Sequence, residues 1–239
     1  MFVWREQIGT VNLAVTDRDG GVSSGAWGSL NLAAHVGDDP DAVAHNRRRL
    51  GQAIGLGPDR LVFMSQVHGA GVAVVEGPWD AEPPEVDALV TATPGLALAV
   101  LVADCTPVLL ADPQAGVLGV AHAGRPGLAA GVVTAAVDAM AALGASRVRA
   151  WVGPSICPAC YEVPESMRAE VAALVPQAWA LSRTGTAALD IAAGVRAQLA
   201  GRVEQVEQLP GCSREEPRLF SYRRDRVTGR FAGLLWRSA

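Results

Sequence analysis

Three short apolar runs follow one another in the middle of the chain, and polar or turn-forming residues separate them. The runs predict strands over 97–103, 106–111 and 117–121, with a turn at Asp112-Pro113 between the last two. Apolar residues then recur at helical spacing and predict an amphipathic helix over about 127–143. The pattern is typical of buried strands that lead into a helix.

The same patterns predict further elements on both sides of this stretch. A helix is expected from Asp39-Pro40 to Ile54, since aspartate is a good N-cap and proline fits the first helical position. The other expected elements are a strand pair within 1–16, strands at 30–32, 61–69, 71–77 and 87–91, a strand within 147–156, helices near 165–174 and 186–200, and a strand within 203–208. No repeat, linker or low-complexity tract interrupts the chain, so we expect a single domain over 1–239.

Polar or reactive side chains stand where the apolar runs end. Asp104, Cys105 and His122 lie beside the three central strands, and His68 lies upstream in the segment SQVHG. Buried polar groups cost free energy unless they are paired or bound to a metal. We therefore expect the fold to assemble these side chains into a site.

Composition narrows the classes of function. The formal net charge is only −4 and no basic or acidic block occurs, which argues against nucleic-acid or membrane partners. The N-terminal MFVWREQ lacks the apolar region of a signal peptide, so a cytoplasmic location is expected. The chain contains no lysine, which excludes Schiff-base chemistry and a Walker-type phosphate loop.

Two imidazoles and one thiolate suggest a metal site. Zinc accepts nitrogen and sulfur ligands, and three protein ligands would leave a fourth position for water or substrate. Because the separations between His68, Cys105 and His122 are long, only the residue types support this, and His68 taken alone is better explained as a core histidine.

The other three cysteines give little evidence of a functional role. Cys157 and Cys160 form a single CxxC pair without a second pair, which favours a structural or incidental role, and Cys212 has no partner in sequence. Five arginines lie in the C-terminal segment 219–237, which fits either a solvated turn or a clamp for phosphate or carboxylate.

Seven segments in a fixed order resemble one known family over almost the whole chain. They are SLNLAAHVGDDPDAV with Asn46-Arg47, SQVHG, DALVT, LVADCTPVLLAD, GVAHAG, GPSI with CYEV, and FSYRRD with TGR. The chain thus resembles the laccase-domain or YfiH-type proteins, also described as multicopper polyphenol oxidase-like and as purine nucleoside phosphorylases.

The resemblance implies an α+β fold with mixed β-sheets flanked by helices, like that of cytotoxic-necrotizing-factor-like cysteine hydrolases. It also implies a catalytic zinc held by His68, Cys105 and His122, and phosphorolysis of adenosine, inosine, guanosine and methylthioadenosine with adenosine deamination as a side activity. The partners would then be small molecules, and the protein a monomer or homodimer. We expect the substrate and phosphate contacts to come from Asn31, His35, Arg47, Asp104, Arg125 and Arg223.

Two positions depart from the family pattern. HAGRPG stands where the family usually has HAGWRG, which moves the arginine to Arg125 and places Pro126 behind it. Arg226 stands where the family usually has glycine. If that position needs a positive φ, a side chain there costs about 1 kcal/mol.

Three alternatives stay open. A copper oxidase is one, although a blue-copper centre would use the two histidines and the cysteine once, and only His35 and His45 would remain for further copper atoms. A cysteine or metal hydrolase that edits peptidoglycan precursors, with Cys105 as nucleophile, is another. A binding module without catalysis is the third.

Overall fold

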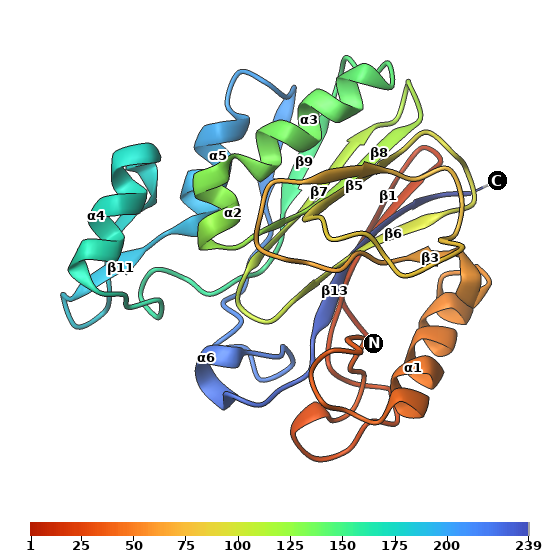
Figure 1. The fold of residues 1–239 in the computed structure, drawn as a ribbon, viewed down its shortest axis with the longest axis horizontal. Helices are drawn as coiled ribbons and strands as arrows, with labels where there is room; N and C mark the ends of the chain where they lie inside the picture. Colours follow the sequence, from red (N-terminus) through yellow and green to blue (C-terminus); the bar gives the residue numbers. More distant parts are fainter. Residues whose placement is uncertain (239) are drawn as a thin grey trace.

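Two β-sheets packed face to face form the centre of the molecule in a computed structural model that describes residues 1–238 (Figure 1). The five-stranded sheet has the order β1 (Phe2–Ile8), β2 (Val11–Thr16), β13 (Phe231–Arg237), β6 (Ala97–Val102), β3 (Leu61–Val62). The six-stranded sheet has the order β12 (Gln205–Gln208), β9 (Arg149–Val152), β7 (Thr106–Asp112), β8 (Val117–Ala123), β5 (Ala88–Thr91), β4 (Val72–Val74). Both sheets mix parallel and antiparallel pairs, as the family resemblance implied.

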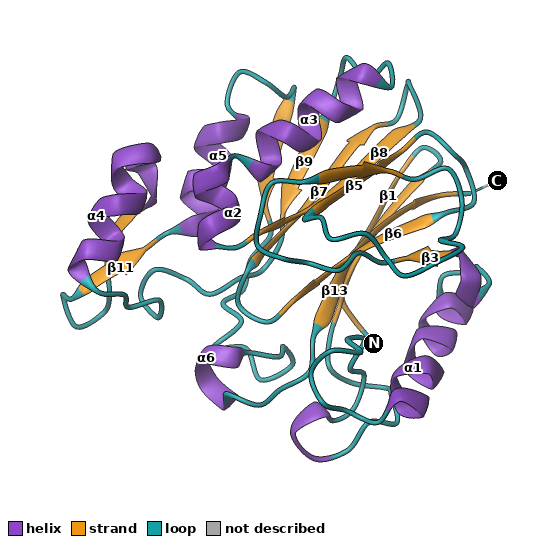
Figure 2. Ribbon diagram, in the orientation of Figure 1, coloured by secondary structure: helices purple, strands orange, loops and turns teal. Residues whose placement is uncertain are grey.

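Helices cover the outer face of each sheet (Figure 2). Those over the six-stranded sheet are α2 (Arg125–Ala130), α3 (Val132–Ala142) and α5 (Ile191–Leu199). Helix α1 (Pro40–Ala53) packs against the five-stranded sheet. The remaining elements are α4 (Glu165–Leu174), α6 (Tyr222–Asp225), the hairpin β10 (Trp179–Leu181) with β11 (Ala187–Leu189), and 3-10 turns at Gly25–Trp27, Pro58–Arg60 and Pro176–Ala178.

This layering explains why the central strands have no polar face. In β6, Leu98 and Val100 enter the core between the sheets, whereas Ala99 and Leu101 face the layer that contains α1. Successive side chains of a strand point to opposite sides, so a strand covered on both faces must be apolar at every position. The unbroken apolar runs of the sequence therefore mark the strands at the centre of the sandwich.

The chain crosses from one sheet to the other at four segments, and three of them contribute residues to one cavity. Residues 63–71 connect β3 to β4, residues 103–105 connect β6 to β7, and residues 209–230 connect β12 to β13. The polar residues singled out in the sequence lie in or beside these crossings. The fold thus gathers them from distant parts of the chain.

Most predicted elements are confirmed, some with shorter bounds. The predicted strand at 61–69 is reduced to Leu61–Val62 because the chain leaves the five-stranded sheet there. Gly131, with φ +81°, divides the predicted helix at 127–143 into α2 and α3. Two expectations are wrong: residues 30–32 form no strand, since their backbone groups bind loop partners, and Ala187–Leu189 is a strand rather than part of the last predicted helix.

Within residues 1–238, no helix has both the length and the apolar character needed to cross a bilayer. This agrees with the absence of a long apolar run in the sequence.

A buried carboxylate fixes the turn that was predicted at Asp112-Pro113. Asp112 is 1% exposed, and its side chain accepts four backbone N–H groups, two from the turn and two from Ser146 and Arg147 before β9. Burial alone would raise the pKa of Asp112, but the four hydrogen bonds outweigh burial and lower it. The ionised form is therefore the one that stabilises the fold.

We expect Asp112→Asn to lower the free energy of unfolding at pH 7 by about 2 kcal/mol, because an amide group would turn N–H donors toward N–H donors. A lowered pKa gives stability that is present above the unfolded-state value and is lost as the pH falls through the folded-state value. The difference between variant and wild type in urea unfolding should therefore shrink below about pH 4. Asp80→Asn, at an exposed loop position, is the matched control and should change nothing. An equal deficit at pH 7 and pH 3 would contradict this account.

Candidate functional site

A cavity of about 670 Å³ opens where the three crossing segments meet. Such a volume suits a small molecule of nucleoside size. The predicted site residues that line this cavity are His35, His68, Asp104, Cys105, His122, Arg125 and Arg223. Asn31 and Arg47 are not among the residues that line it.

His68, Cys105 and His122 lie together at the base of this site. One ligand atom of each lies within 4.8 Å of the other two, and Cys105 Sγ is 3.8 Å from His68 Nε2. The two imidazole rings meet edge to face with their centroids 4.7 Å apart. The three predicted metal ligands are therefore neighbours in space, although 37 positions separate His68 from Cys105 in sequence and 17 separate Cys105 from His122.

Asp87 holds two of these three residues in place. Its carboxylate accepts a hydrogen bond from His122 Nδ1 at 2.8 Å and from the backbone N–H groups of His68 at 2.9 Å and Gly69 at 2.6 Å. The backbone of Asp87 also accepts the N–H of His122. Because Nδ1 of His122 is bound in this way, Nε2 is the nitrogen that remains for a ligand.

Local backbone geometry aims the side chains into the site. His68 has φ +62° and Asp104, next to Cys105, has φ +99°, both in the region that favours glycine. Gly124 provides the space, since a Cβ there would lie 2.8 Å from the His68 ring and 3.2 Å from Cys105 Sγ. Strained backbone at such positions is common where a fold fixes functional groups.

The electrostatics of the cluster favour a thiolate. Burial raises the pKa of Cys105, but the His122 imidazolium and hydrogen bonds with both histidines outweigh burial and lower it to about 6. Burial lowers the pKa of His122, but the Cys105 thiolate and the Asp87 carboxylate outweigh burial and raise it to about 9. A thiolate is the form of cysteine that binds a metal or acts as a nucleophile.

The donor set fits a zinc-type metal ion. It provides one thiolate and two imidazole nitrogens, and a carboxylate orients one imidazole from behind, as in many zinc sites. Three protein donors would leave a fourth position for water or substrate.

Arginines give the cavity a positive wall. Arg125, Arg223, Arg226 and Arg230 all line it, and none of them forms an ion pair with a carboxylate among residues 1–238. Pro126 lies in the first turn of α2, where proline is tolerated, so the displaced arginine opens the helix and still reaches the cavity wall. An anionic ligand would supply the missing counter-charge.

The carboxylate of Asp104 accepts three hydrogen bonds from other residues of the protein. Oδ1 accepts the hydroxyls of Ser213 and Ser221 at 2.6 Å each, and Oδ2 accepts the N–H of Arg223 at 2.6 Å. Asp104 therefore fastens the crossing before Cys105 to the C-terminal loop that carries the arginines.

Asn31 and Arg47 support the cavity from behind its wall. Asn31 is fully buried, and its amide bonds the backbone of Ala33 and Arg230 and the Asp38 carboxylate. Arg47 donates from Nε to Leu32 O, and its guanidinium lies 4.0 Å from the centre of the Phe63 ring.

Arg226, which stands where the family usually has glycine, has the strained backbone geometry that this position suggested. Arg226 has φ +63° and ψ −61°, a conformation that glycine adopts more easily. Its side chain nevertheless lines the cavity, so the same substitution that strains the turn adds a positive charge to the site.

Sequence reasoning missed several residues of the site. Asp87 and Tyr161 lie in DALVT and CYEV, segments that carried the family resemblance, but no role was assigned to them. Cys212 has no partner in sequence, but it has one in space, because Cys157 N–H donates to Cys212 Sγ at 3.4 Å. The parallel pairing of β9 and β12 brings Cys157 and Cys212 together.

Comparison with known proteins supports the family resemblance that the sequence motifs indicated. A family model described as multi-copper polyphenol oxidoreductase laccase matches residues 12–238. A protein of Streptomyces griseus named purine nucleoside phosphorylase is 60% identical over 233 residues, 95% of each chain. One of the same name from Streptomyces coelicolor is 57% identical over 97% of this chain and 98% of its own.

Solved structures support the fold. The crystal structure of YlmD from Geobacillus stearothermophilus has a TM-score of 0.90 at 33% identity, with 97% of this chain and 93% of that chain covered. YfiH from Bacillus licheniformis has a TM-score of 0.86 at 29% identity, with 94% and 92% covered. The expected α+β fold is therefore confirmed, and the chain belongs to the multi-copper polyphenol oxidoreductase laccase family, the YfiH-type group that its motifs resemble.

Proposed function

We propose that this protein is an enzyme that cleaves purine nucleosides with phosphate, a purine nucleoside phosphorylase. The observation that carries the proposal is that the His68–Cys105–His122 cluster shares one cavity with four arginines that form no ion pair with a carboxylate of residues 1–238. The names of relatives at 60% and 57% identity support it. The cavity takes residues from His35 to Arg230, and on that ground we also propose that residues 1–239 act as one domain.

His68, Cys105 and His122 would hold the metal, and we infer zinc from one sulfur and two nitrogen donors. When bound, zinc would supply a Lewis acid that polarises an oxygen of the substrate. Asp87 keeps the His122 ring oriented, and Gly124 keeps the approach free of side chains.

The arginines would bind phosphate. Arginine forms charge-assisted, often paired hydrogen bonds with phosphate oxygens. Arg125 opens α2, and Arg223 donates its backbone N–H to Asp104 and its Nη1 to Glu162 O. These contacts fix where Arg223 stands, so that a phosphate would be placed against C1′ of the ribose with little further ordering.

The reaction also needs a proton. A phosphate oxygen forms a bond to C1′ as the bond from C1′ to the purine nitrogen breaks, and the purine leaves with that electron pair and takes up a proton. Burial raises the pKa of Tyr161, so its hydroxyl keeps a proton at neutral pH. Tyr161 lines the cavity, and we assign it as the candidate proton donor.

We extend the proposal to adenosine, inosine, guanosine and methylthioadenosine as substrates and to adenosine deamination as a second activity, as the family resemblance implies. A copper oxidase is less well supported by the site. Of the two remaining histidines, His35 lines the cavity and His45 lies on α1 outside it. Residues 1–238 therefore offer no histidine-rich cluster for several copper atoms.

We expect the purified protein to convert adenosine and inorganic phosphate to adenine and ribose 1-phosphate, measured by chromatography, with inosine as a further product from adenosine. Product should depend on phosphate, and Cys105→Ala should abolish it because the variant loses a metal ligand. Asp80→Asn, at an exposed loop position outside this cavity, is the control and should keep turnover. A wild-type protein that makes neither adenine nor inosine would refute the proposed function.

Removing the Asp87 carboxylate, which orients His122, should weaken metal binding without abolishing it. We expect Asp87→Asn to lower zinc affinity at this site about 10- to 100-fold in competition with a chelator, since it removes the carboxylate that orients His122. Asp80→Asn should match wild type. In the zinc-loaded protein, iodoacetamide should leave Cys105 unmodified until zinc is removed. Modification of Cys105 at the same rate with and without zinc would instead favour a metal-free cysteine hydrolase.

The phosphate role of the arginines can be tested by steady-state kinetics. Arg223→Ala should raise KM for phosphate roughly 10- to 100-fold, since a hydrogen bond to a charged group contributes about 1.5–3 kcal/mol. KM for adenosine should change much less. Arg196→Ala, on the exposed face of α5, is the matched control. An unchanged phosphate KM in Arg223→Ala would remove this residue from the phosphate site.

A further inference from the structure

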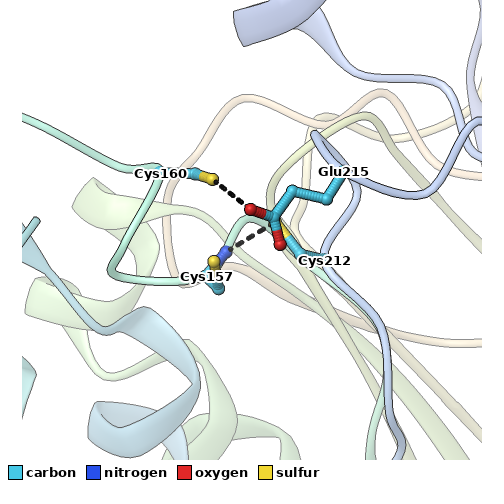
Figure 3. A group of neighbouring side chains, drawn as sticks. All are labelled: Cys157, Cys160, Cys212 and Glu215. Atoms are coloured by element: carbon cyan, nitrogen blue, oxygen red, sulfur yellow. Dashed lines mark hydrogen bonds between the residues drawn. The ribbon is translucent and has the colours of Figure 1, made fainter. Parts of the chain in front are cut away.

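A second cluster of potential metal ligands lies outside the cavity. It contains Cys157, Cys160, Cys212 and Glu215, whose ligand atoms all lie within 4.8 Å of one another (Figure 3). The figure shows the three sulfur atoms and the carboxylate of Glu215 turned toward one another from two loops. No step of the proposed function uses this cluster.

The sheet brings the two loops together. Strands β9 and β12 pair in parallel, so the loops that follow them leave the sheet at the same edge. The pairing continues past the strands, because Leu209 N–H bonds Val152 O and Ser213 N–H bonds Ser155 O at 3.0 Å. The position of Cys212 opposite the CxxC pair is therefore fixed by backbone contacts.

Both loops have the same ligand spacing and the same kind of turn. Cys157 O accepts the N–H of Cys160 at 2.9 Å, and Cys212 O accepts the N–H of Glu215 at 3.0 Å. Each pair of ligands is thus separated by two residues within a tight turn. Two such pairs facing each other are typical of structural zinc sites, in which the second pair is usually also cysteine.

The distances and chemistry suit a tetrahedral ion. Ligand atoms around zinc with bonds of about 2.3 Å lie roughly 3.8 Å apart, so only small side-chain rotations are needed from the observed cluster. Cys157 N–H points at Cys212 Sγ, and a backbone N–H placed in this way stabilises a thiolate.

Nearby arginines balance the charge of the complex. Three thiolates and one carboxylate carry four negative charges, and a zinc ion would leave two. Arg183 donates to Cys160 Sγ at 3.6 Å and also contacts Glu215, while Arg214 donates to Cys160 O at 3.4 Å. Two positive side chains therefore lie where the zinc complex would need them.

We propose that Cys157, Cys160, Cys212 and Glu215 bind a structural zinc ion, at a site separate from the His68–Cys105–His122 cluster. All four ligands come from the protein, so no position is left for substrate, which distinguishes a structural from a catalytic zinc. The ion would cross-link the loop after β9 to the loop after β12.

The cross-link would act on the cavity through its neighbours in sequence. Tyr161 directly follows Cys160 and lines the cavity. Ser213 directly follows Cys212 and donates to Asp104, and Ile156 N–H, one residue before Cys157, bonds Asp104 O at 2.9 Å. The zinc ion would thus hold in place both loops that position Asp104 and Tyr161.

Metal counting on the full-length protein tests this. After expression with added zinc and dialysis, mass spectrometry of the metal content should give two zinc ions per wild-type chain. Cys212→Ser and Glu215→Ala should each retain one, and so should Cys105→Ser. Glu216→Gln changes the neighbouring carboxylate in the same loop and should retain two. The count for Cys105→Ser separates this site from the metal of the proposed function.

Cobalt(II) gives a second readout that does not depend on activity. In Cys105→Ser loaded with cobalt, three thiolates should remain on the metal, so strong sulfur-to-cobalt absorption with tetrahedral visible bands should persist. In Cys212→Ser the same absorption should fall by at least half. Wild type titrated with a chelator should lose the absorption and melt at a lower temperature, which keeps the test valid if a variant fails to fold.

Three results would overturn the proposal. One is a single zinc ion in wild type that disappears in Cys105→Ser. Another is a count in Cys212→Ser and Glu215→Ala equal to that of wild type. The third is a disulfide among Cys157, Cys160 and Cys212 in protein purified without oxidant, shown by fewer than four titratable thiols under denaturing conditions.

Discussion

The site depends on one buried carboxylate, that of Asp87. It binds the ring of His122 and the backbone on both sides of His68, and it is completely removed from solvent. A buried charge is tolerated only when its hydrogen bonds are satisfied, and these donors satisfy it. Because two of these donors belong to His68 and His122, which would hold the metal, the cost of burying Asp87 is offset by contacts that also set the geometry of the site.

Much of the fold could be predicted from the sequence because its central strands are covered on both faces. The runs at 97–103 and 106–111 read as strands because every side chain except that of Thr106 is apolar. Helix α1 was located by Asp39 before Pro40, and Asp39 caps the helix as expected. Local sequence patterns were less informative where tertiary contacts determine the backbone conformation. Leu30 and Leu32 are buried like strand residues, but they belong to a loop that the fully buried Asn46 organises through hydrogen bonds to Ser29 O and Asn31 O.

The candidate site was predicted in part, and for identifiable reasons. Residue types and motif order gave His68, Cys105 and His122, which the fold brings together. Motif order did not distinguish residues that face the cavity from residues that support its wall, so Asn31 and Arg47 were grouped with Arg125 and Arg223. The Cys157–Cys212 neighbourhood could not be foreseen, since 55 residues separate the two and only the parallel pairing of β9 with β12 joins them.

The crossings between the sheets have a mechanical consequence. His68 lies in the crossing from β3 to β4, Cys105 in the crossing from β6 to β7, and His122 at the end of β8 in the six-stranded sheet. An ion held by all three would cross-link the two sheets and so resist the sliding of one sheet over the other. Occupancy of the site and the mutual alignment of the sheets would then be thermodynamically linked, so ligand binding would stabilise the whole sandwich rather than a single loop.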